Sequence, residues 1–165
     1  MVPLRVLTLA VSNPMQPAVL VLEPIEEDLG GATRIMPIWV GPSEAASLGL
    51  AIENQRAKRP LTHDLFLDAL TNLDARIDHV LIDKAEAQVF YSKLVLKQGD
   101  RLIELDARPT DAITLAIRQG APLFVEEETL ANSSYPYIFK REAAGAATLE
   151  EFRSFLDDIS PEDFA

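Results

Sequence analysis

The chain has 165 residues, a length that suits one compact domain with a single core and a short tail. Its 48 % hydrophobic and 25 % charged residues exclude a disordered chain, and the absence of cysteine excludes disulfides and thiolate metal sites. The net charge of −11 argues against binding nucleic acid through a broad basic surface, so such contact must use a local arginine cluster or a bridging cation. No apolar run reaches membrane-spanning length, and we expect a cytoplasmic protein with no membrane partner.

The first half of the chain reads as three strands followed by a helix. Leu4 to Val11 alternates and predicts a strand, and the apolar run Pro17 to Glu23 predicts a strand buried on both faces. Arg34 to Val40 predicts a third strand. Gly41-Pro42-Ser43-Glu44 then begins a helix, because proline suits the first turn and an acid there faces the positive end of the helix dipole. We expect this helix to run to about Ala57.

The second half begins with a helix from about Thr62 that carries His63 and Asp64 in its first turn. The elements expected after it are strands at 77–83, 89–97 and 101–106, a helix at 109–119 and a short strand at 121–125. Residues 132–136 read as loop or linker, and the amphipathic stretch Leu149 to Ile159 predicts a helix. We therefore expect a domain over residues 1–130, followed by a linker and helical tail over 131–165.

The chain repeats itself. Residues 34–50 align without a gap on residues 101–117, so that Glu44 corresponds to Asp111 and Gly41 to Arg108. The strands before them also correspond, Val6 with Val80 among them, shifted by 74 positions. Chance similarity between two proline-initiated helices is the alternative, but the number of matches favours duplication. The expected fold is α+β, with internally duplicated strand-strand-strand-helix units forming one mixed-sheet domain and a C-terminal helical tail.

The motif Asp106-x-Arg108-x-x-Asp111 places two carboxylates and a guanidinium at a strand-to-helix junction. Free helix N–H groups, an arginine and acids are the groups that hold a phosphate or orient a metal-bound water. A purely structural role is the alternative: Asp111 caps its helix, and Arg108 pairs with Asp106 or Asp111.

A second candidate group is Arg59-Pro-Leu-Thr-His63-Asp64, in which a histidine and an acid share the first turn of a helix. Such a histidine can act as a general base or a metal ligand, or it can be a surface side chain without a task. Glu44 is the counterpart of Asp111 in the first repeat. Because that repeat has Gly41 in place of an arginine, the pattern indicates one elaborated site rather than two equal ones.

Three motifs together, Met36-Pro-Ile-Trp-Val-Gly41 followed by Glu44-Ala45, Arg59 to Asp64, and Asp106 to Ile113, resemble the bifunctional nuclease family over roughly Leu4 to Leu130. The resemblance implies an α+β hydrolase of phosphodiester bonds, with DNA or RNA as substrate, and a homo-oligomer. The candidate residues that the motifs then offer for activating water or binding a divalent cation such as Mg²⁺ or Mn²⁺ are Glu44, His63, Asp64, Asp106 and Asp111. Arg59 and Arg108 are the candidates for holding the phosphate.

Two other hypotheses fit the same residues. The first is a non-enzymatic regulatory module in which the Arg108 junction binds an anion or the chain binds a protein partner. The second is that the junction residues only hold a dimer together.

Overall fold

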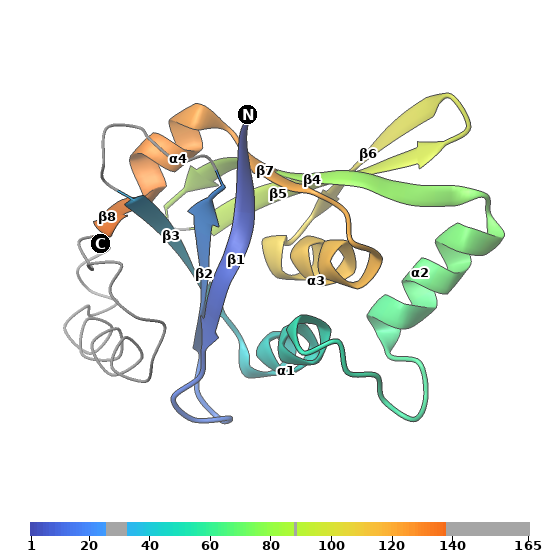
Figure 1. Cartoon of the computed structure of the whole chain (residues 1–165), viewed down its shortest axis with the longest axis horizontal. Coiled ribbons are helices and arrows are strands. Elements are labelled where there is room, and N and C mark those ends of the chain that lie inside the picture. The colour runs from blue at the N-terminus through green and yellow to red at the C-terminus, as the bar shows by residue number, and fades with distance from the viewer. Residues whose placement is uncertain (26–32, 88, 138–165) are drawn as a thin grey trace.

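The computed structural model of the protein describes residues 1–25, 33–87 and 89–137. Within this part of the chain, eight strands form one sheet in the order β6-β5-β4-β7-β1-β2-β3-β8, and four helices accompany it (Figure 1). Neighbouring strands run antiparallel except for β4 and β7, which run parallel. The fold is therefore α+β with a mixed sheet, as the sequence predicts.

The two predicted repeats lie on opposite sides of β7. The first consists of β1 (Val2–Ala10), β2 (Ala18–Pro24), β3 (Thr33–Val40) and α1 (Pro42–Ile52). The second consists of β4 (Ala75–Glu86), β5 (Val89–Gln98), β6 (Arg101–Ala107) and α3 (Pro109–Gln119). Six consecutive residues of β2 are buried, which confirms the prediction of a strand covered on both faces.

Strand pairing confirms the duplication residue by residue. The second and third strands of the two repeats have equivalent registers, as the pairs Ala18–Val40 and Leu22–Met36 correspond to Ser92–Ala107 and Leu96–Ile103. The helices that follow begin at equivalent prolines and have the same length of 11 residues. The offsets read from the sequence for these elements are therefore correct.

The first strands correspond with a different offset from the one expected. Leu20 and Leu94 are equivalent, and their partners are Leu9 and Val80, respectively. Leu9, rather than Val6, is thus the counterpart of Val80. Both strands carry a bulge at the equivalent place, between Val6 and Thr8 and between Ile77 and His79, so the bulges do not change the offset. The stretch that joins the first two strands is longer in the second repeat: Leu9 and Leu20 are 11 positions apart, and Val80 and Leu94 are 14. Apolar alternation does not reveal the length of such a connection.

The helices α1, α2 (Thr62–Asn72) and α3 lie on the same side of β4 and β5, in the angle between these strands and β1 (Figure 1). α1 packs directly on α3, where the small residues Ala45, Ala112 and Ala116 are buried. Large wholly buried side chains from both repeats fill the core between helices and sheet: Leu20, Leu22, Met36, Leu48, Ile82 and Ile113. The two repeats therefore share one core.

The helix α1 ends at Ile52, five residues before the expected end at Ala57. Asn54 adopts a φ of 52°, and the amide of Gln55 donates to the Leu50 carbonyl at 2.8 Å. Asparagine tolerates this left-handed conformation better than most residues, so the chain turns away there. The basic residues that follow lie in the connection to α2 and not at the end of the helix.

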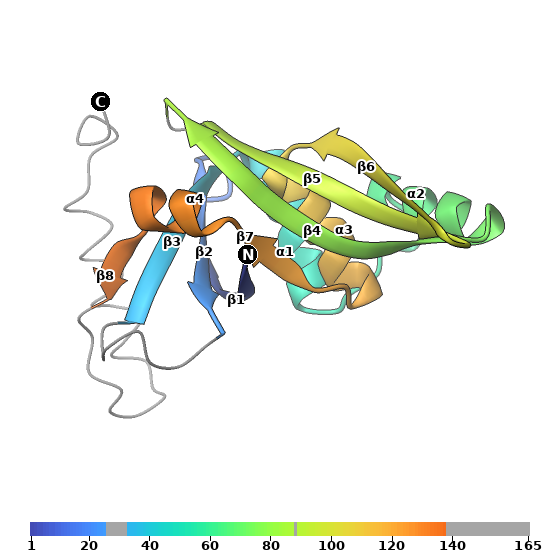
Figure 2. The same cartoon turned by 90° about the horizontal axis from the view of Figure 1, so that it is seen from above.

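The remaining elements are β7 (Leu123–Val125), α4 (Glu127–Ser133) and β8 (Tyr135–Tyr137). Residues 132–136, expected to be a loop, belong mostly to α4 and β8. β8 lies beside β3 and pairs with it (Figure 2). Arg34 Nε donates to Ser134 Oγ at 2.7 Å, which holds this segment against the sheet. The amphipathic helix expected at Leu149 to Ile159 lies outside the described residues. None of the described helices is long and apolar enough to span a membrane.

Candidate functional site

The starts of α1 and α3 have the same local structure. Gly41 and Arg108 are the N-cap residues, both in extended conformation, and a proline follows each. Glu44 and Asp111 occupy the first turns of the two helices at equivalent positions. Because α1 packs on α3, the two starts are close enough for side chains to connect them.

Arg108 makes this connection. Its Nε donates to Asp111 Oδ2 at 2.7 Å, and its Nη1 donates to Glu44 Oε1 at 2.8 Å. The hydrogen bond to Asp111, the charge of Asp111 and then the hydrogen bond to Glu44 raise the pKa of Arg108 above its usual value. The side chain is 65 % exposed, so the guanidinium is held by two carboxylates and still faces solvent.

His63 joins the group from α2. Its Nε2 lies 3.2 Å from Asp111 Oδ1, and only 17 % of the imidazole side chain is exposed. Burial raises the pKa of the Asp111 carboxyl, but the hydrogen bond and charge of Arg108, followed by those of His63, together lower it below its usual value. Asp111 is therefore a carboxylate that holds an arginine on one oxygen and a histidine on the other.

We call Glu44, His63, Arg108 and Asp111 the Arg108 network. Three helices contribute to it, and all four residues are among the seven site candidates from the sequence. The structure thus brings together acids that are 67 positions apart in the chain, Glu44 and Asp111. It also shows that Asp111 uses both oxygens for side chains from its surroundings.

The other three candidates lie outside the network. Asp64 Oδ2 accepts from the backbone amide of Leu61 at 3.0 Å, and its Oδ1 lies 3.7 Å from Arg118 Nε, near the other end of α3. Arg59 is exposed in the connection between α1 and α2. Asp106 is exposed on β6, where it pairs in register with Lys93.

Gly41 gives the network room, a role that the sequence pattern did not reveal. A Cβ atom at this position would lie 2.6 Å from Glu44 Oε2, closer than real Cβ contacts allow. Its φ of −64° suits any residue, so the need for glycine is steric. The replacement of arginine by glycine in the first repeat therefore lets Glu44 fold back over its own N-cap and meet Arg108.

Carboxylates and a histidine in one place raise the question of a metal ion. Across residues 1–25, 33–87 and 89–137, no group of three or more histidine, aspartate and glutamate side chains has an arrangement that could hold one. Mg²⁺ is usually held by one or two carboxylates together with substrate phosphates, and Glu44 and Asp111 could contribute in that way.

Comparison with known proteins places these motifs in a family. The family model described as the bifunctional nuclease domain matches residues 25–137. An uncharacterized protein of Mycobacterium tuberculosis is 37 % identical over 165 residues, covering 97 % of this chain and 96 % of that protein. Bifunctional nuclease 2 of Oryza sativa subsp. japonica is 30 % identical over 135 residues, which cover 80 % of this chain and 42 % of that protein. Bifunctional nuclease 1 of the same rice is 25 % identical, and its match covers 90 % of this chain and 44 % of its own length. The chain thus spans less than half the length of these rice relatives.

Proposed function

The chain belongs to the bifunctional nuclease family, and we propose on that premise that it hydrolyses phosphodiester bonds of DNA, RNA or both. The observation that carries the proposal is the Arg108 network, in which a cation, a histidine and two carboxylates from three helices meet. Phosphodiester hydrolysis needs groups that bind the phosphate, stabilise its developing charge and transfer protons.

Arg108 is the phosphate-binding group in this proposal. A guanidinium has five N–H donors, and Nε and Nη1 each give one to the carboxylates. The remaining donors, on a side chain that is 65 % exposed, can bind phosphate oxygens. Asp111 and Glu44 fix the orientation of the guanidinium before the substrate arrives.

His63 is the proton-transfer group. An imidazole can gain and lose a proton near neutral pH, and Asp111 orients the ring through Nε2. Nδ1 is then the nitrogen assigned to take a proton from water or give one to the leaving oxygen. In this arrangement Asp111 positions both Arg108 and His63.

The charge of the network bears on the need for a cation. Apart from His63, the two carboxylates and one guanidinium sum to a net charge of −1, which repels the phosphate of a nucleic acid. A divalent cation, held by Glu44 or Asp111 together with the substrate, supplies positive charge at the phosphate when bound. The proposal therefore includes dependence on Mg²⁺ or Mn²⁺.

Cleavage of labelled single-stranded DNA and RNA by the purified protein, with Mg²⁺, Mn²⁺ or EDTA, tests the proposal. His63→Ala and Asp111→Asn should each reduce cleavage about 100-fold or more, while Asp100→Asn, an exposed acid in the β5–β6 turn, should leave it unchanged. A wild-type protein that cleaves neither nucleic acid under any of these conditions refutes the proposal. So does full activity of both network variants.

A structural clamp is the second candidate function, because Arg108 bonds to one acid from each repeat. Exposed ion pairs contribute only about 0 to 1 kcal/mol to stability, and this small contribution argues against the clamp as the sole role of Arg108. A thermal-shift screen separates the candidates. A shift that needs both nucleotide and metal favours the nuclease, a shift with phosphate alone favours an anion-binding module, and no shift with any of these ligands favours the clamp.

We further propose that the chain forms a homo-oligomer, which the family resemblance implies. β6 lies at one edge of the described sheet, and Leu102 on it is 62 % exposed. An apolar side chain on an open edge strand can pack against a second copy of the chain. Leu102→Lys should reduce the mass measured by light scattering, and an unchanged mass rules out this edge as the contact.

A further inference from the structure

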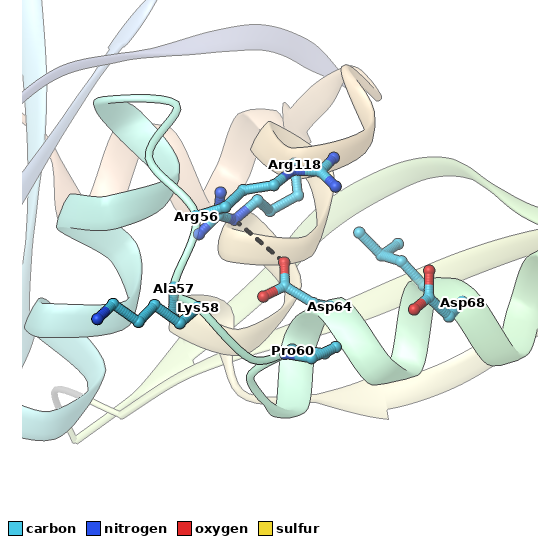
Figure 3. A pocket seen from close by; sticks show the side chains of 8 residues that line it. Arg56, Ala57, Lys58, Pro60, Asp64, Asp68 and Arg118 are labelled. Carbon is cyan, nitrogen blue, oxygen red and sulfur yellow. Dashed lines mark ion pairs between the residues drawn. The ribbon is translucent and has the colours of Figure 1, made fainter.

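A groove of about 260 Å³ lies beside the proposed site, between the connection after α1, the start of α2 and the end of α3. Its charged lining residues are Arg56, Lys58, Asp64, Asp68 and Arg118, and we call it the α2–α3 groove. Figure 3 shows the ion pair between Asp64 and Arg118 across it, with Asp68 further along α2. Asp64 follows directly after His63, so one turn of α2 contributes to both the network and the groove.

Arg118 is the central cation of the groove. Only 5 % of its side chain is exposed, and its Nη1 donates to the carbonyl of Gln55. Its Nε has no hydrogen-bond partner among the described residues, because Asp64 Oδ1 at 3.7 Å is too distant for a hydrogen bond and provides only electrostatic attraction. A buried guanidinium N–H without an acceptor is costly, and an oxygen of an anion in the groove would satisfy it.

The charges around Arg118 favour an anion. Three cations and two carboxylates line the groove, an excess of one positive charge in a chain of net charge −11. Asp64 is already engaged, since it also accepts from the Leu61 amide. The cations reach this place because α1 ends early at Ile52, which leaves Arg56 and Lys58 in the connection beside α3.

We propose that the α2–α3 groove binds a backbone phosphate of a nucleic-acid strand, a few nucleotides from the phosphodiester bond that is cleaved at the Arg108 network. The inference rests on the proposed function for its choice of ligand. Asp111 and Arg118 are seven residues apart on α3, which corresponds to about 10 Å along the helix. At about 3.4 Å for each stacked nucleotide, the two places are about three nucleotides apart.

The distance between the two places predicts a dependence on strand length. Arg56 is the residue to change, because it is exposed and its loss leaves the core intact. Arg56→Ala should raise the Kd of a fluorescein-labelled strand of six phosphorothioate-linked nucleotides about tenfold. It should leave the affinity for a dinucleotide, whose single phosphate reaches only the Arg108 network, within about twofold. For the longer strand, the slope of the logarithm of the association constant against the logarithm of the salt concentration should become less negative by about 0.7.

Arg101→Ala is the matched control, since Arg101 is an exposed arginine at the start of β6, outside the groove. It should change neither affinity nor the salt slope. The groove proposal is overturned if Arg56→Ala and Arg101→Ala weaken binding equally, or if Arg56→Ala weakens the binding of both strand lengths equally. Either result would favour general electrostatic attraction. Because the assay measures binding, a wild type that binds through Arg56 without cleaving refutes the nuclease and supports the groove. Cleavage that does not depend on Arg56 at any strand length supports the nuclease and refutes the groove.

Discussion

Glu44 and Asp111 occupy the same position in the two repeats, and both accept a hydrogen bond from the guanidinium of Arg108. An internal duplication would ordinarily give two similar helix starts with one acid each. Here one repeat has an arginine and the other a glycine at the N-cap, so the two acids share a single cation. The asymmetry converts two equivalent junctions into one site.

The first prediction concerns the shared guanidinium. Arg108→Ala should lower the rate of cleavage by about 100-fold or more, because it removes the donors proposed to bind phosphate and leaves two carboxylates facing each other. Arg108→Lys should remain strongly impaired, since an ammonium group cannot span Asp111 and Glu44 with the same geometry. The measurement is single-turnover cleavage of a labelled oligonucleotide, with Arg101→Ala as the control. Retention of more than half the rate in Arg108→Ala would contradict the assignment.

The second prediction is a pH dependence of stability. Because the folded-state pKa of Asp111 is lowered below 3.8, its contribution to stability is fully present above that pH and is lost as the pH falls through the lower, folded-state value. The melting temperatures of the wild type and Asp111→Asn should differ most at neutral pH and converge in acid below the folded pKa. In the Arg108→Ala background the convergence should occur at higher pH, because the largest favourable partner is gone. A difference that grows on acidification would reverse the sign and refute the assignment.

The third prediction uses two glycines as a matched pair. Gly41→Ala should reduce activity strongly with little change in stability, because a Cβ 2.6 Å from Glu44 Oε2 displaces the flexible Glu44 side chain from Arg108. Gly49→Ala should keep activity and stabilise the protein by about 0.5 to 1 kcal/mol, because it lies inside α1 and its Cβ would make an ordinary 3.8 Å contact with Leu9 Cδ2. Denaturant unfolding and cleavage assays measure both. Equal activity in the two variants would show that the position of Glu44 is unimportant.

The fourth prediction tests the duplication itself. Ser92 is fully buried and donates through Oγ to the Ala107 carbonyl at 2.6 Å, while its counterpart in the first repeat is Ala18. Ser92→Ala makes the second repeat like the first and should lower the free energy of unfolding by about 1 kcal/mol, the net contribution of one hydrogen bond. Because Val40 is the counterpart of Ala107, the hydroxyl of Ala18→Ser should donate to the Val40 carbonyl, and the free energy of unfolding should stay within about 1 kcal/mol of the wild type. A larger destabilisation by Ala18→Ser would show that the two environments are not equivalent.

Most elements of the fold are predictable from the sequence because their signals are local. The run Pro17 to Glu23 is apolar enough to identify a buried strand, and proline followed by an acid locates the start of both repeat helices. The predicted end of α1 at Ala57 is wrong, because the turn at Asn54 depends on a left-handed conformation that asparagine permits but does not require. The predicted correspondence between β1 and β4 is also wrong, since the connection to the next strand is three residues longer in the second repeat and an apolar pattern does not reveal that length.

By itself, the sequence determined the duplication, the α+β architecture and the short set of charged residues from which a site could be built. Only the tertiary structure decided which of them meet. Packing of α1 on α3 brings Glu44 to Arg108, and the position of α2 directs His63 to Asp111 while the adjacent Asp64 turns to Arg118. Asp106 has the same charge as Glu44 and Asp111. It lies only two residues from Arg108, yet it is exposed on β6, outside the network. Spacing along the chain fixes local neighbours, but contacts between distant side chains depend on how the helices pack.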